Sequence, residues 1–514
     1  MKNKLHNQDS IKKRYFFSLA INILLCVPRF LNASLIPRAL GPASFGDYQF
    51  LINNFTSIRN FLDMGTATAF FTYSAKNDIS NRFNSQYLAW FFIQLILIVS
   101  IVAISAISGT YGHIWPGQHI ENIILAAVCV WTFLFAQQIV QFGDSKGLTV
   151  EFQKMNLFSN YIAATILTGL FFWGTITIRS ALLIYVAAPL SIIFISIYRY
   201  YLRFLKFTGR FSDSLAENFA YFRTYCSPLV ILMLFTFLAD FLDRWMLQKF
   251  AGAEAQGFYS LSYNWAAIAL LFFNPVLNIF WREVSMLIRD NKKNEAGALF
   301  DKFVRFLFVI TAFISVFLAF NARDIILLIA GKSFEPARFS FMTMMFFPLV
   351  QVYGQLAGCL FYAAENTKAF RNIGIAQSVI FTAATYIVMA PKNLLIPGFE
   401  LGATAFTVKV FLAQLIGTDI LVYYICQKNH VAYNRLINHR FFTIVTLVTI
   451  YMIQLFFLSE TCNSDNLIAS LFLKFTFYLL PTSLIFLFFS KYFIGIEIEE
   501  IKKSLKYFRQ TTIL

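Results

Sequence analysis

Charged and amide side chains lie inside stretches of this chain that are otherwise apolar. The guanidinium group of Arg suits phosphate by geometry and charge, and amide groups hydrogen-bond to hydroxyl groups. An ionisable residue at the centre of a membrane helix costs about 2.5–3.5 kcal/mol, so such residues face a polar interior or a partner. They are therefore candidate binding residues for a polar substrate. The candidates are Arg29, Asn53, Arg59, Asp63, Gln137, Gln141, Asp240, Arg244, Asn264, Asn274, Asn278, Gln351, Gln355 and Lys409.

Two pairs among these residues also have a structural interpretation. Arg59 and Asp63 are four residues apart, as are Asp240 and Arg244, so each pair lies within one helical turn. Each pair could cancel its own charge, which lowers the cost of insertion and fixes helix packing. Substrate binding and simple pairing both stay open for these four residues.

The remaining candidates divide in the same way. Arg29 and Lys409 have no carboxylate within a helical turn, which favours a role in binding. The glutamines recur as i, i+4 pairs on two segments, where they would share one helical face. They could contact substrate or join neighbouring helices by hydrogen bonds, which contribute about 0.6 kcal/mol each in membranes.

Motifs for catalysis and metal binding are absent from the sequence. It contains no P-loop, no His-Glu-x-x-His and no dinucleotide-binding glycine fingerprint, and none of its six cysteines forms a Cys-x-x-Cys motif. We therefore predict no catalytic residue, no metal site, no cofactor and no enzymatic activity. Coupling to H⁺ or Na⁺ through Asp63 or Asp240 stays open.

The elements that must position these residues are membrane helices. The 514 residues are 58% hydrophobic and only 13% charged, whereas soluble proteins carry roughly a quarter charged residues. Segments of about 20 mainly apolar residues predict about 14 transmembrane helices. We place them near residues 15–36, 48–75, 87–108, 121–143, 157–177, 180–198, 225–247, 258–281, 303–321, 339–363, 372–390, 401–424, 440–458 and 467–490.

Loop charge predicts the orientation of these helices. The loops 199–224 and 282–305 are basic, whereas the loops 109–120 and 459–466 contain no Lys or Arg. Because basic loops stay in the cytoplasm, both termini are expected there. The net charge of +16 is therefore a topology signal, with anionic lipid as a secondary contact, and it does not indicate nucleic-acid binding.

An internal repeat divides the chain. A shift of 211 residues places Gly41 on Gly252 and Gly46 on Gly257, and a shift of 214 residues places the first glutamine pair on the second. The sequence thus predicts two parallel six-helix bundles, related by a pseudo-two-fold axis along the membrane normal, plus two C-terminal helices. The domain boundaries would be 1–210, 211–430 and 431–514. Each Gly-x4-Gly pair, Gly41 with Gly46 and Gly252 with Gly257, is expected to turn the chain tightly between two spans, with positive φ.

Three phrases resemble a known family: "IPRALGPASFGDYQF", "FLDMGTATAFF" and "LDRWMLQKFAGAEAQGFYSLSYNW". They are similar to the multidrug/oligosaccharidyl-lipid/polysaccharide exporter superfamily, and within it to the Wzx-type O-antigen flippases. The resemblance covers residues 12 to 425, and Pro-Arg-x-Leu-Gly-Pro…Gly-x-Tyr at 37–48 is its most specific part. It implies a non-enzymatic flippase of the bacterial plasma (inner) membrane. Its cargo would be an undecaprenyl-diphosphate-linked oligosaccharide moved outward by alternating access.

This resemblance gives the candidate residues their expected roles. Arg29, Arg59, Arg244 and Lys409 would neutralise the diphosphate, and the Asn and Gln side chains would contact sugar hydroxyls. A polysaccharide polymerase and a chain-length regulator are the expected protein partners, beside membrane lipids. Two alternatives remain, namely a drug/cation antiporter of the same superfamily and a membrane oligosaccharide polymerase.

Overall fold

The computed structural model describes residues 11–76, 81–145, 148–204, 215–270, 274–458, 467–493 and 495. These residues are almost entirely helical, and no strand occurs among them. Helices satisfy every backbone hydrogen bond internally, which the hydrocarbon core of a bilayer requires. The predicted all-α class is confirmed.

Eleven of the described helices are long and apolar enough to cross a membrane. The first of them, Ala20–Asp63, covers the predicted span 15–36 and part of the span 48–75. The helices over the predicted spans 225–247 and 258–281 are not among the eleven. The chain is therefore a multi-pass membrane protein, while the predicted count of fourteen is not confirmed.

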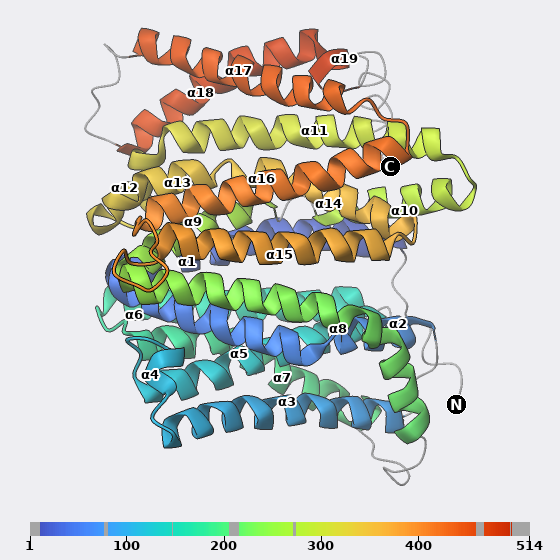
Figure 1. The fold of residues 1–514 in the computed structure, drawn as a ribbon, viewed down its shortest axis with the longest axis vertical. Helices are drawn as coiled ribbons and strands as arrows, with labels where there is room; N and C mark the ends of the chain where they lie inside the picture. Colours follow the sequence, from blue (N-terminus) through green and yellow to red (C-terminus); the bar gives the residue numbers. More distant parts are fainter. Residues whose placement is uncertain are drawn as a thin grey trace. The chain divides into compact units, whose positions relative to one another are not determined.

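The chain forms two compact units, and the first consists of residues 1–260 and 378–403. Within it α1 packs against α5, α6 and α8, and α5 packs against α7 (Figure 1). The division between the units passes through α9 and α15. The helices of this unit are α1 (Ile11–Asp63), α2 (Thr66–Lys76), α3 (Asn81–Ile107), α4 (Tyr111–Ile114), α5 (Ile120–Ser145), α6 (Thr149–Phe172), α7 (Ile178–Phe204), α8 (Leu215–Met246), the π-helix η1 (Leu247–Ala251) and parts of α9 (Gly252–Leu270) and α15 (Thr367–Met389).

The second unit consists of residues 261–377 and 404–514. Its core lies where α11 packs against α14 and α17, and α18 packs on α17 (Figure 1). The boundaries 1–210, 211–430 and 431–514 remain a prediction. The further helices of this unit are α10 (Asn274–Arg289), α11 (Lys293–Phe320), α12 (Ala322–Ile329), the 3₁₀-helix η2 (Lys332–Ala337), α13 (Arg338–Met344), α14 (Phe347–Ala363), α16 (Ala403–Lys428), α17 (Tyr433–Leu458), α18 (Leu467–Phe488) and α19 (Ser490–Phe493).

The repeated glycines share one backbone conformation. Gly41 has φ 72° and ψ 171°, and Gly252 has φ 86° and ψ 175°, a region that only glycine populates readily. The positive φ expected of each glycine pair therefore occurs at its first member, whereas Gly46 and Gly257 lie within helices. Their companions allow α1 and α9 to touch: a Cβ on Gly46 would lie 1.8 Å from the carbonyl oxygen of Ala253, and one on Gly257 would lie 2.1 Å from that of Pro42.

The predicted span 48–75 is not one helix, which corrects the sequence interpretation. The chain leaves the helical conformation at Met64 and Gly65, with φ 49° and 83°. The carboxylate of Asp63 accepts hydrogen bonds from Thr66 Oγ1 at 3.0 Å and from the backbone N–H of Ala67 at 3.2 Å. Asp63 thus caps the start of α2, since these first N–H groups have no partner within their helix.

Candidate functional site

A cavity of about 580 Å³ lies within the second unit, between α10, α14, α15 and α16. Its wall contains both members of the second predicted glutamine pair, Gln351 and Gln355, from adjacent turns of α14. Glycines on the same helix leave space along this wall, since a Cβ on Gly358 would meet no heavy atom within 4 Å. The lining residues are Leu277, Trp281, Gln351, Gly354, Gln355, Gly358, Cys359, Tyr362, Phe370, Gln377, Gln414, Thr418 and Leu421.

Four glutamines of this cavity come from three helices. Gln377 of α15 donates from Nε2 to the carbonyl oxygen of Gly417 at 2.8 Å, and Gln414 of α16 donates from Nε2 to Thr418 Oγ1 at 3.2 Å. The Oε1 atom of Gln355 is buried and has no hydrogen-bond partner among the described residues. A buried acceptor of this kind costs about 1–3 kcal/mol when left unpaired. A residue that lines the cavity thus carries an unpaired acceptor.

Aromatic rings form the other part of the wall. Trp281 of α10 lies 6.0 Å from Tyr362 of α14, and Tyr362 lies 5.4 Å from Phe370 of α15, measured between ring centroids. None of the described lining residues carries a charge. Amides that donate and accept, set beside aromatic faces, suit a neutral ligand with many hydroxyl groups and an apolar ring face.

Lys409 lies on α16 of the same unit but does not line this cavity. It is only 8% exposed, and its ammonium nitrogen lies 5.8 Å from the ring centroid of Phe406. A buried lysine in a membrane helix faces protein or water and is shielded from lipid. Its burial agrees with the expectation that Lys409 faces the protein interior.

In the first unit, Arg59 and Asp63 form the ion pair that their spacing allows. Arg59 Nη2 lies 3.4 Å from Asp63 Oδ1, and the two side chains are 4% and 10% exposed. The Arg59 guanidinium also covers the ring of Phe91 at 4.8 Å. Pairing and packing thus account for these contacts, and substrate binding by the pair remains a prediction.

The polar groups at the end of α8 each have a distinct environment. Arg244 donates from Nη1 to Ser260 Oγ at 3.2 Å and covers the ring of Tyr259 at 4.4 Å. The carboxylate of Asp243 accepts from Thr385 Oγ1 at 2.6 Å. Asp240 is exposed at the surface of the first unit. The α8 carboxylates therefore differ, since one is held by a hydroxyl and the other is open.

The other predicted residues of the first unit are dispersed over two helices. Arg29 of α1 is half-buried, and its Nη1 has no hydrogen-bond partner in the described part of the chain. Asn53 donates from Nδ2 to the carbonyl oxygen of Gln49 in its own helix at 2.7 Å. Gln137 and Gln141 are exposed on α5. Arg29 is therefore the member of this group with an unsatisfied buried donor.

Three predicted asparagines add little to the site. Asn264 of α9 is half-buried. Asn274 and Asn278 lie in the first turns of α10, but their side chains lie outside the described residues. Pro275 follows Asn274 directly and lies in the first described turn of α10.

Several polar contacts of the second unit were not predicted from the sequence. Gln377 and Gln414 complete the glutamine set, although each is a lone amide in an apolar segment. Lys474 of α18 lies 2.8 Å from the carboxylate of Asp324, and their 150-residue separation hides the pair from any spacing rule. The only signal in the sequence is the presence of an isolated amide or charge within an expected span.

Comparison with known proteins identifies the family. Residues 11–280 match the family described as polysaccharide biosynthesis protein. No curated protein matches the chain.

Solved structures share the fold at low sequence identity. A lipid II flippase, MurJ, in an inward closed conformation is similar with a TM-score of 0.64 and 14% identity, over 92% of this chain and 98% of that chain. A multidrug resistance MATE family transporter of the MOP superfamily, in an inward-facing conformation, is similar with a TM-score of 0.60 and 12% identity, over 80% of this chain and 94% of that chain. The outward-facing form gives 0.55 and 12%, over 82% and 97%. The chain therefore belongs to the polysaccharide biosynthesis protein family and has the fold of the multidrug/oligosaccharidyl-lipid/polysaccharide exporter superfamily, as its motifs indicate.

Proposed function

We propose that this chain is a flippase for a polyprenyl-diphosphate-linked oligosaccharide, moved from the cytoplasmic to the outer leaflet of a bacterial plasma membrane. The family concerns polysaccharide biosynthesis, and one protein with this fold is a lipid II flippase. The single observation that carries the proposal is the neutral cavity of the second unit, where four glutamines meet three aromatic rings. A sugar head cannot cross hydrocarbon without such partners, because its hydroxyl groups would lose their water.

The proposed division of labour follows the chemistry of the side chains. The glutamine cavity receives part of the sugar head, and the buried, unpaired acceptor Oε1 of Gln355 takes a hydroxyl hydrogen bond when the ligand binds. Lys409 and Arg29 are the proposed partners of the diphosphate, because neither has a carboxylate within a helical turn. Asp240 is the proposed site of any H⁺ or Na⁺ coupling, since its carboxylate is exposed whereas Asp63 is engaged.

Replacing Gln355 by Met tests the cavity. Met has a similar length but neither donates nor accepts a strong hydrogen bond, so Gln355→Met removes the open acceptor and keeps the volume. One lost hydrogen bond of about 1 kcal/mol predicts a five- to tenfold fall in outward movement of lipid-linked oligosaccharide. The measurement is the ratio of outer to inner lipid-linked oligosaccharide in cells whose own flippase is deleted.

Gln427→Met is the matched control, because Gln427 is exposed on α16 outside the cavity. It should transport like the unchanged protein at equal membrane abundance. Equal transport by both variants would contradict sugar binding at this cavity. Export of a cationic dye, with no effect on lipid-linked oligosaccharide, would instead identify a drug/cation antiporter.

A further inference from the structure

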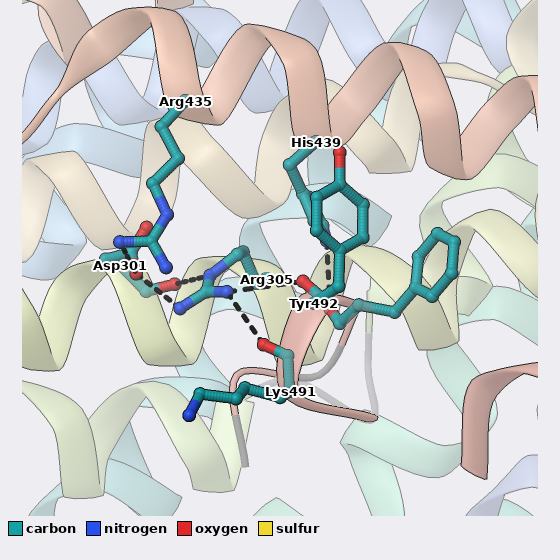
Figure 2. A network of polar contacts seen from close by, with 7 residues as sticks. Asp301, Arg305, Arg435, His439, Lys491 and Tyr492 are labelled. Atoms are coloured by element: carbon teal, nitrogen blue, oxygen red, sulfur yellow. Dashed lines mark hydrogen bonds and ion pairs between the residues drawn. The ribbon is translucent and has the colours of Figure 1, made fainter. Parts of the chain in front are cut away.

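A second cavity, of about 390 Å³, lies in the second unit beside the middle of α11. The start of α17 and the end of α18 with α19 meet α11 there (Figure 2). It lies apart from the glutamine cavity, since the two share no lining residue. The residues that line it are Arg305, Arg435, His439, Phe488, Phe489, Lys491 and Tyr492.

Arg305 forms the fixed wall of this basic pocket. Its side chain is 7% exposed, and its Nη2 lies 2.5 Å from the carboxylate of Asp301. Its Nη1 donates to the backbone carbonyl oxygens of Lys491 and Tyr492 at 3.3 and 3.2 Å (Figure 2). Arg305 thus holds α19 in place and leaves the pocket with a rigid cationic floor.

The other two cations are exposed at its rim. The Arg435 guanidinium lies 3.9 Å from Asp301, and its side chain is 63% exposed. Lys491 is also exposed. Arg305 and Arg435 therefore share the Asp301 carboxylate within the described part of the pocket, so an anionic ligand meets more cationic than anionic groups there.

His439 adds a buried polar group to the same pocket. It is 2% exposed, and its Nε2 lies 2.9 Å from the carbonyl oxygen of Phe493. Its Nδ1 is buried and has no hydrogen-bond partner in the described part of the chain. This nitrogen is an unsatisfied group in the wall of a cationic cavity.

The apolar part of the rim indicates what kind of anion fits. Phe488 and Phe489 are 76% and 62% exposed beside the cations. Exposed phenyl rings at the end of a membrane helix contact acyl chains, whereas a free phosphate would make no use of them. Basic pockets between membrane helices bind the headgroups of anionic lipids.

We propose that the basic pocket binds the phosphodiester headgroup of an anionic membrane phospholipid, whose acyl chains lie over Phe488 and Phe489. The headgroup contacts Arg435, Lys491 and the fixed guanidinium of Arg305. This bound lipid is a resident of the pocket and is separate from the transported cargo. By the loop charges it belongs to the cytoplasmic leaflet.

The test compares lipid binding by two double variants of the full chain. Arg435→Gln with Lys491→Gln removes two exposed cations of the pocket and leaves Arg305 and Asp301 paired. Arg289→Gln with Lys292→Gln is the control, because these exposed residues are equal in charge and lie outside the pocket. The probes are dioleoyl-phosphatidylglycerol, dioleoyl-phosphatidylcholine and inorganic phosphate, with retained lipid measured by native mass spectrometry.

The unchanged protein and the control should retain phosphatidylglycerol at least tenfold better than phosphatidylcholine, and the pocket variant should lose this preference. Equal binding by both double variants would overturn the proposal. Displacement of the lipid by inorganic phosphate at equal concentration would show an anion site without lipid specificity, which also overturns it. So would phosphatidylglycerol binding that appears only after Glu497, Glu499 and Glu500 are changed to Gln, since the chain's own carboxylates would then be the occupant.

Discussion

At the scale of single residues, the carboxylate of Asp63 has three partners among the described residues of the first unit. It pairs with Arg59 and also accepts from Thr66 and Ala67 at the start of α2. Both functions are structural, and they explain why an acid and a base share one turn of α1. The sequence predicts the ion pair from its spacing, whereas the capping role depends on a helix break that the apolar pattern does not show.

Asp63→Ala should lower the free energy of unfolding of the protein, so any loss of transport should come with a loss of stability. The change leaves the 4%-exposed Arg59 side chain without its carboxylate, and breaking a buried pair in this way costs about 3–5 kcal/mol. Asp63→Asn keeps one of the two oxygens that accept from Thr66 and Ala67, so it should recover part of the loss. The measurement is the midpoint of thermal unfolding in detergent.

The exposed pair Arg179–Glu121 provides the comparison, because both side chains are more than half exposed. Glu121→Ala should cost about 0–1 kcal/mol. If Asp63→Ala unfolds at the unchanged temperature and transport is nevertheless lost, Asp63 acts on substrate or on a coupling ion instead.

The glutamines show how much of the cavity the sequence predicts. Gln351 and Gln355 are predictable as one face of a helix, because four residues complete about one turn. Gln377 and Gln414 join them only through the packing of α15 and α16, and Gly417 permits that approach: a Cβ there would lie 2.9 Å from Gln377. No spacing rule connects residues on three separate helices, so the cavity itself could not be predicted.

At the scale of elements, the repeated glycines set the path of α1 and α9. Gly46→Ala should prevent their contact, because the new methyl group would meet the backbone of Ala253, which cannot rotate away. We expect at least a tenfold loss of folded protein in the membrane, measured by fluorescence-detected size-exclusion chromatography.

Gly169→Ala in α6 is the matched control, since a Cβ there would meet no heavy atom within 4 Å. Alanine in a helix is favoured over glycine by about 0.5–1 kcal/mol, so this variant should be as abundant as the unchanged protein or more so. A folded, abundant Gly46→Ala protein would show that α1 and α9 do not need this close contact.

The helices themselves were largely predictable, and their interruptions were not. An apolar run of 20 residues indicates a membrane helix whatever its neighbours are. The break at Met64 and Gly65 falls inside such a run, where hydropathy gives no signal. Glycine is tolerated there because Asp63 accepts from the backbone N–H of Ala67 in the first turn of α2.

At the scale of the whole molecule, the distribution of positive charge predicts which side each loop faces. In a background of Cys462→Ser, Gly112→Cys should react with a membrane-impermeant maleimide in intact cells, because its loop contains no Lys or Arg. Lys292→Cys should react only after the cells are permeabilised, since it lies in a basic loop. Both positions are exposed, and a Cβ on Gly112 would meet no heavy atom within 4 Å.

The five cysteines within the described residues are half-buried or buried, so the background signal should be low. Labelling of Lys292→Cys in intact cells would reverse the orientation and place both termini outside. The overall fold was predictable because the phrases at 37–48 and 242–265 resemble the superfamily whose fold the chain shares. The arrangement of side chains inside each unit was not, because it depends on contacts between distant segments.

The buried acceptor of Gln355 has a practical consequence. A ligand that donates a hydrogen bond to this atom should raise the midpoint of thermal unfolding. The reason is that a ligand that binds only the folded state shifts the unfolding equilibrium by mass action. Melting curves recorded with a panel of free sugars would thus rank those sugars without membranes, gradients or lipid carriers. Under the proposed function, the sugar that raises the midpoint of thermal unfolding most is the one expected in the head of the transported lipid.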